Sequence, residues 1–140
     1  MGTNIGFRRS DGKEATGYLA GAGRANAPGI VVIQEWWGLQ DQIKGIADRF
    51  ALAGYDALAP DLYAGTVVPY HVTDAAGKEM NSLNFLDATD NTVRGAAEFL
   101  KKGGAKVGRT GFCLAGAVTI IGGCRIPELS AAVCFYGIPP

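Results

Sequence analysis

The chain has 140 residues, of which 48% are apolar and 19% are charged. Its 13 lysines and arginines balance its 13 aspartates and glutamates, so the zero formal net charge gives no electrostatic attraction to nucleic acid or to an anionic membrane. This composition is typical of a soluble globular protein, and we expect a single domain over residues 1–140.

Neither a membrane segment nor a disulfide or metal framework is expected. The longest apolar stretches, such as residues 29–33 and 131–135, are too short to span a bilayer, and the N-terminus lacks an apolar signal core. The three cysteines, Cys113, Cys124 and Cys134, show no CxxC or Cys/His spacing. We therefore expect a cytoplasmic protein with reduced thiols, no metal site and no membrane partner.

The first half of the chain predicts strands that alternate with helices. Residues 15–22 have short strand character, and the β-branched run at residues 30–35 is typical of a buried central strand. Apolar residues then recur at helical spacing over residues 41–53, and Gly54 ends that helix.

A second strand lies within residues 55–63 and ends at Pro60. It is followed by a long irregular stretch at residues 64–73, and long loops of this kind are often functional. Helical spacing returns briefly at residues 74–80 and then, from residue 86 or 87, continues to residue 102.

The last part of the chain predicts a strand, a helix and a strand, at residues 105–112, 113–123 and 130–137. We expect the final strand to be buried. The repeated alternation of strands and helices predicts an α/β fold, with a mostly parallel sheet flanked by helices.

The most informative motif is GFCLAG, in which Gly111 and Ala115 flank Cys113 at the junction of a strand and a helix. This is the pattern of a nucleophile elbow, a sharp turn that exposes a nucleophile and accepts only small neighbours. The helix N-terminus would stabilise a thiolate at Cys113, and the backbone amide of Leu114 would face a developing oxyanion. The alternative is a cysteine that serves only in packing.

Four segments resemble the dienelactone hydrolase family in order and in spacing: IVVIQEWWGL, GYDALAPDLYAG, KVGRTGFCLAGAV and AAVCFYGIPP. The resemblance covers nearly the whole chain and implies an α/β-hydrolase fold. It also implies a hydrolase that acts on lactones or small carboxylic esters, with Cys113 as the nucleophile and no cofactor. One departure is local, because family members commonly have glycine where this chain has Ala115.

The resemblance also implies roles for residues that follow the first central strand. Glu35 matches the glutamate that pairs with the nucleophilic thiol and helps to deprotonate it. The backbone N–H of Trp36 would join that of Leu114 in an oxyanion hole. Trp37 and Tyr70 are candidates for substrate contact, although paired tryptophans also serve as simple core residues.

The acid and the histidine of the family's triad lie after the strand that AAVCFYG represents. The resemblance therefore covers about the first three fifths of the usual domain, without its last strands and helices, and neither triad partner can be assigned here. The only histidine, His71, lies in the long loop and is a weak substitute base.

Two functional interpretations stay open at this point. In the first, the protein is an ester or lactone hydrolase whose catalysis is weak or incomplete without the triad acid and histidine. In the second, it is a non-catalytic homologue that acts as a small-molecule-binding or assembly module; a redox-sensing thiol is a third, more distant interpretation. Because the sheet would present an apolar edge at the AAVCF strand, we also expect a homodimer or higher homo-oligomer through this edge.

Overall fold

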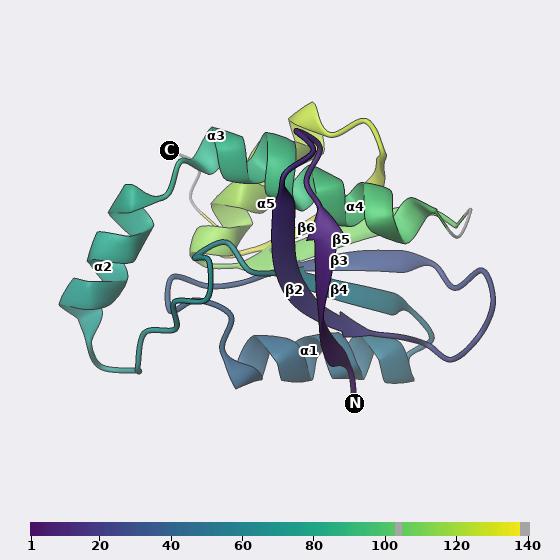
Figure 1. The fold of residues 1–140 in the computed structure, drawn as a ribbon, viewed down its shortest axis with the longest axis horizontal. Helices are drawn as coiled ribbons and strands as arrows, with labels where there is room; N and C mark the ends of the chain where they lie inside the picture. Colours follow the sequence, from purple (N-terminus) through teal and green to yellow (C-terminus); the bar gives the residue numbers. More distant parts are fainter. Residues whose placement is uncertain (103–104, 138–140) are drawn as a thin grey trace.

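The computed structural model describes residues 1–102 and 105–137, and these form three layers with a sheet between helices (Figure 1). The sheet has the strand order β1-β2-β4-β3-β5-β6. The strands are β1 Thr3–Arg8, β2 Glu14–Ala20, β3 Gly29–Ile33, β4 Asp56–Pro60, β5 Val107–Phe112 and β6 Leu129–Phe135. The helical segments are α1 Asp41–Leu52, α2 Thr73–Ser82, α3 Phe85–Asp87, the π-helical η1 Ala88–Val93, α4 Arg94–Lys101 and α5 Leu114–Arg125.

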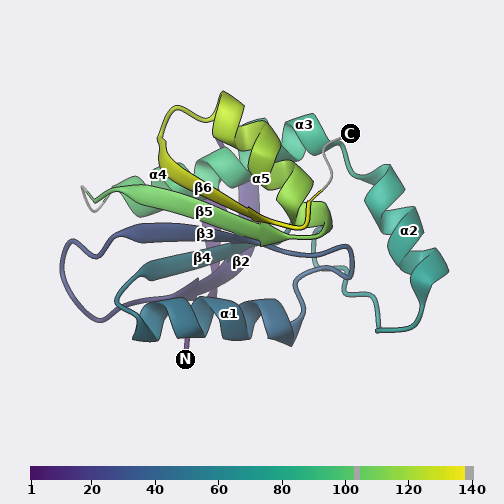
Figure 2. The same cartoon turned by 180° about the vertical axis from the view of Figure 1, so that it is seen from behind.

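The helices cover the two faces of the sheet unequally. Helix α1 packs on one face, over β2, β4 and β3, while α4 and α5 pack on the other face (Figure 2). Strand β3 is buried between them, because Val31 and Ile33 belong to the core on the α4 and α5 side and Val32 belongs to the core beneath α1. The predicted central strand is therefore confirmed.

The predicted α/β fold is confirmed, and the sheet is mixed. Strands β3, β4, β5 and β6 pair in parallel, whereas β1 and β2 add antiparallel pairings at one side. The strand β1 was not predicted. Within the described residues, no helix combines the length and the apolar character needed to cross a bilayer.

The prediction that the final strand is buried is wrong. Strand β6 forms an edge of the sheet, and Val133 and Phe135 are exposed, since α1 packs mainly over β2, β4 and β3. An apolar run identifies a strand but does not say which elements cover it.

Candidate active site

The predicted nucleophile and the predicted glutamate follow neighbouring parallel strands. Strands β3 and β5 pair with Ile33 opposite Gly111. Glu35 and Cys113 each lie two residues beyond this pair, and neighbouring strands lie about 5 Å apart. The sheet therefore brings Glu35 and Cys113 to the same end of the sheet, at the carboxyl ends of the parallel strands β3 and β5.

Cys113 has the strained backbone of a nucleophile elbow. Its φ and ψ are 56° and −121°, a combination that costs energy for a residue with a side chain, and it is the N-cap residue of α5. Two hydrogen bonds hold this turn: Cys113 N–H donates to Phe135 O over 3.1 Å, and Gly116 N–H donates to Cys113 O over 2.9 Å. The side chain is exposed, as a nucleophile must be.

The close approach of strand and helix at this turn leaves no room for a side chain at Gly111 or Gly116. A Cβ atom added to Gly111 would lie 2.5 Å from the carbonyl oxygen of Ala115 and 2.7 Å from Thr119 Oγ1. One added to Gly116 would lie 2.9 Å from Cys134 Sγ. The requirement for a small residue at Gly111, which the motif predicted, is therefore confirmed, and Gly116 is required for the same reason.

Glu35 begins a tight turn that also presents Trp36. Gly38 N–H donates to Glu35 O over 3.1 Å, and Gly38 has a φ of 90°, which favours glycine. Glu35 is half-buried, and burial raises the pKa of its carboxyl. Trp36 N–H has no acceptor within residues 1–102 and 105–137, and the Leu114 N–H lies in the first turn of α5, where no intrahelical acceptor exists.

The two predicted substrate contacts lie together. The rings of Trp37 and Tyr70 meet edge to face with centroids 5.5 Å apart, although the residues belong to different loops. The ring of Trp36 adds a third aromatic group, 4.8 Å from that of Trp37. Tyr70 is exposed and its hydroxyl donates to Gln42 Oε1 over 3.0 Å.

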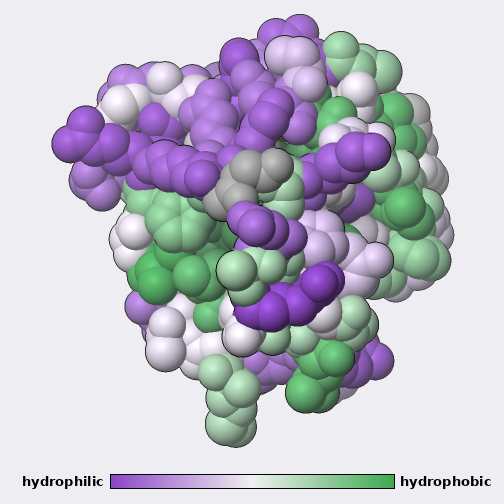
Figure 3. Space-filling view, turned by 90° about the vertical axis from the view of Figure 1, so that its right-hand side faces the viewer, coloured by the Kyte–Doolittle hydropathy of each residue, from purple (hydrophilic) through white to green (hydrophobic). Residues whose placement is uncertain are grey.

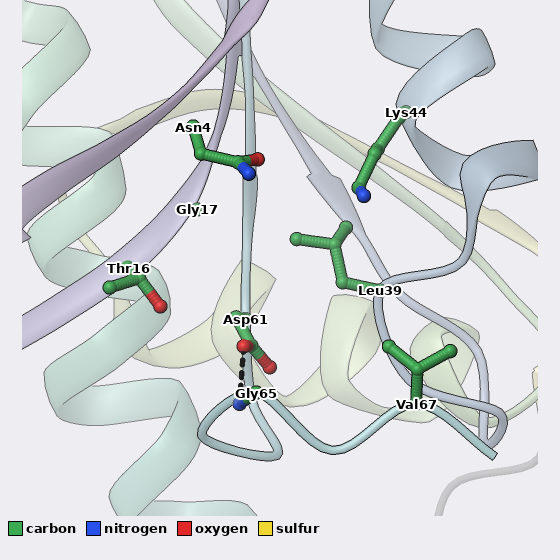
Figure 4. Close-up of a pocket in the computed structure, with 8 residues that line it drawn as sticks. All are labelled: Asn4, Thr16, Gly17, Leu39, Lys44, Asp61, Gly65 and Val67. Atoms are coloured by element: carbon green, nitrogen blue, oxygen red, sulfur yellow. Dashed lines mark hydrogen bonds between the residues drawn. The ribbon is translucent and has the colours of Figure 1, made fainter.

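Other candidate residues do not join this group. His71 is exposed, with a φ of 78° in the loop before α2, and no described contact links it to Cys113. A hollow of about 320 Å³ lies between β1 and β2 on one side and the loops that contain Leu39 and Val67 on the other (Figure 4). Asp61 in this hollow accepts a hydrogen bond of 2.6 Å from Gly65 N–H. None of the predicted site residues lines it.

Two glutamines near the site were not singled out from the sequence. Gln34 is buried and its Oε1 accepts from Leu62 N–H over 3.0 Å. Gln40 precedes α1, and its Nε2 donates to Val68 O over 2.6 Å. A polar residue at the end of an apolar strand is the one signal in the sequence that could have marked Gln34.

The strand order and the strained cysteine between β5 and α5 define the α/β-hydrolase class of protein. The comparisons with known proteins narrow this class. A family model described as the dienelactone hydrolase family matches residues 15–140. The chain belongs to this family.

Among relatives, "Protein usf" of Aquifex pyrophilus is 38% identical over an alignment that covers 99% of this chain and 63% of the relative. An Aquifex aeolicus protein provisionally named as a carboxymethylenebutenolidase is 35% identical with the same coverage. A crystal structure provisionally named as a dienelactone hydrolase, from Klebsiella pneumoniae, superposes with a TM-score of 0.79 at 28% identity and covers 96% of this chain and 60% of its own. The dienelactone hydrolase-like promiscuous phosphotriesterase P91 from metagenomic libraries gives 0.76 at 26% identity, with 97% and 59% coverage.

The chain thus spans about three fifths of the length of the relatives that it matches, with 63% of the Aquifex pyrophilus protein and 60% of the Klebsiella pneumoniae structure covered. The matched region contains the elbow, the glutamate and both candidate oxyanion donors.

Proposed function

We propose that this chain supplies the nucleophile, its carboxylate partner and the oxyanion hole of a hydrolase that acts on lactones or small carboxylic esters. Cys113 is the nucleophile and Glu35 receives its proton. The N–H groups of Leu114 and Trp36 bind the oxyanion, and Trp37 and Tyr70 contact the substrate. The relatives' name carboxymethylenebutenolidase, which denotes a lactone hydrolase, supports this substrate class.

The observation that carries the proposal is the backbone of Cys113. A φ of 56° at a residue with a side chain persists only where the surrounding structure enforces it, and such strain is concentrated at functional sites. Packing alone would not require it, since a buried, inert cysteine can adopt ordinary strand or helix angles.

The chemistry follows from the groups present. The Cys113 thiolate attacks the carbonyl carbon of the ester, and the carbonyl oxygen takes the negative charge between the N–H groups of Leu114 and Trp36. When the tetrahedral intermediate collapses, the C–O bond breaks, the alcohol oxygen takes up the proton that Glu35 received from Cys113, and an acyl-thioester remains on Cys113; the alcohol of a simple ester departs, while that of a lactone stays attached to the acyl group. Water then hydrolyses the thioester with the help of a base, which the family resemblance assigns to a later region than the one matched here.

The test therefore measures acylation of Cys113, which does not depend on the later hydrolysis of the thioester. We expect p-nitrophenyl acetate to release a burst of one p-nitrophenolate per chain and to leave an acetyl adduct on Cys113, detected by mass spectrometry of peptides. Cys113→Ala should abolish both the burst and the adduct, while Cys124→Ala, which removes another exposed thiol, should change neither. An equal burst from the Cys113→Ala variant would refute the proposal.

A further inference from the structure

The loop that bears Glu35 and Trp36 is tied to the loop after β4 at several points. Val68 N–H donates to Trp37 O over 2.9 Å, and Gln40 Nε2 donates to Val68 O over 2.6 Å. Both hydrogen bonds therefore converge on Val68, whose side chain is buried. The two loops form one unit, although residues 40 and 68 are 28 positions apart.

The two loops also touch where Gly38 closes the turn. A Cβ atom on Gly38 would lie 2.5 Å from Thr66 O, so the backbones are in direct contact. Gln40 N–H donates to Gly38 O over 2.9 Å, which links the Gln40 backbone to the same turn. The position of the Trp36 N–H, at the centre of the turn from Glu35 to Gly38, thus depends on how firmly Gln40 holds Val68.

We propose that Gln40 is a positioning residue for acyl transfer: its side-chain amide fixes the turn that directs the Trp36 N–H at the oxyanion. The inference rests on the proposed function, because it assumes that this N–H binds the developing charge. The described hydrogen bonds of the Gln40 side chain and backbone N–H go to Val68 and Gly38, and none joins Gln40 to Cys113. A preorganised donor is effective only when its position is already set before charge develops.

Two reactions of the Cys113 thiol can show whether Gln40 positions the oxyanion donor or only supports the structure in general. Acylation by p-nitrophenyl acetate forms an S–C bond and expels p-nitrophenolate through an oxyanion intermediate. Alkylation by iodoacetamide forms an S–C bond and expels iodide in one displacement, with no oxyanion. Both reactions need the Cys113 thiolate, and only the first needs the Trp36 N–H.

The test is the ratio of these two rates in Gln40→Met, which keeps the length of the side chain and removes the donor. Loss of a whole oxyanion donor costs about 10² to 10³ in rate, so loosening one should lower acylation about tenfold. Alkylation should change less than twofold. Gln40→Glu, which also lacks the donor, should lower the ratio in the same direction.

Asn81→Leu on α2 is the control, because it removes an exposed side-chain amide that makes no described contact with the turn at Trp36 or with Cys113. We expect it to leave the ratio unchanged. Equal losses of acylation and alkylation in Gln40→Met would leave the ratio unchanged and would show a merely structural role. That outcome would overturn the inference, as would unchanged rates of both reactions. If the wild-type burst does not depend on Cys113, the proposed function itself fails, and the Cys113→Ala arm identifies that outcome.

Discussion

Ile33 on β3 lies directly opposite Gly111 on β5 in the parallel register of the sheet. Strand β3 ends at Ile33 and β5 ends one residue after Gly111, at Phe112, so both chain segments leave the sheet at the same end. Glu35 and Cys113 occupy equivalent positions there, and the proposed proton transfer from thiol to carboxylate needs no further element to bring the two chain segments together.

Glu35→Gln should reduce the reactivity of Cys113 and stabilise the fold at neutral pH. Burial raises the pKa of the Glu35 carboxyl, so the folded chain holds this proton to a higher pH than the unfolded chain does. The resulting contribution to stability is present at low pH and is lost as pH rises through the raised pKa. The glutamine side chain of Glu35→Gln stays uncharged at neutral pH and avoids this loss. We therefore expect the Tm of the variant at pH 7.5 to be higher by about 2 °C. At pH 4 and below the two Tm values should converge.

The same variant should lower both acylation and alkylation of Cys113 by at least about tenfold, because a general base typically contributes about 10² or more. Glu14→Gln on β2 is the control, since that carboxylate is exposed. Unchanged alkylation in Glu35→Gln would contradict the role of Glu35 as the proton acceptor.

Gly111→Ala should disrupt the elbow, whereas Gly108→Ala on the same strand should be tolerated. The added methyl group at residue 111 would overlap the backbone of Ala115, while at residue 108 its nearest neighbour, Ala131 O, is at an ordinary 3.5 Å. Overpacking of this kind costs about 1–3 kcal/mol. We expect Gly111→Ala to lose that much stability in urea denaturation and to show no p-nitrophenyl acetate burst. Normal acylation in this variant would mean that the close approach is not needed for the nucleophile.

The parts of the site that the sequence predicted are those set by local patterns. GFCLAG contains the strand end, the turn and the helix start within six residues, whereas Glu35 was assigned through the resemblance of IVVIQEWWGL to the family. Gln40 and Val68 carry no such pattern, since their contact joins two irregular loops. The sequence predicted an apolar edge at the final strand, but the description of that strand as buried was wrong: burial depends on which helix lies over a strand, and the strand's own residues do not determine it.

We expect the chain to associate with a second copy of itself through β6. Strand β6 is an edge strand without a charged residue, and Val133 is 51% exposed beside Phe135, Ile30 and Phe50 along an apolar groove of about 570 Å³. Figure 3 shows hydrophobic residues along its right-hand edge and a further group at its left. An uncharged edge can pair antiparallel with its copy about a two-fold axis, so we propose a homodimer.

Val133→Lys should convert this dimer to a monomer, because a lysine on an edge strand opposes strand pairing. Val72→Lys is the control, since Val72 is 46% exposed and lies outside the sheet. Sedimentation velocity at micromolar concentration distinguishes the two species. A wild-type monomer under these conditions would contradict the proposed interface.

Two adjacent glycines near the end of α5 should respond in opposite ways to alanine. Arg109 is 1% exposed and extends beneath this helix, where its Nε donates to Thr119 O over 3.1 Å and its Nη2 donates to Val118 O. Burial lowers the pKa of Arg109 to about 10. A methyl group on Gly122 would overlap the guanidinium, whereas one on Gly123 would make only a 3.4 Å contact with Ala132 Cβ.

Alanine is favoured over glycine inside a helix by about 1 kcal/mol, so Gly123→Ala should stabilise the chain by up to that amount. In Gly122→Ala the overlap with Arg109 should outweigh this gain and leave a net loss of about 1–2 kcal/mol. Urea denaturation of both variants measures the difference, and adding Arg109→Met should rescue Gly122→Ala, because a flexible apolar side chain can yield to the new methyl group. If the two glycine variants were equally stable, the buried guanidinium would not be what requires glycine at residue 122.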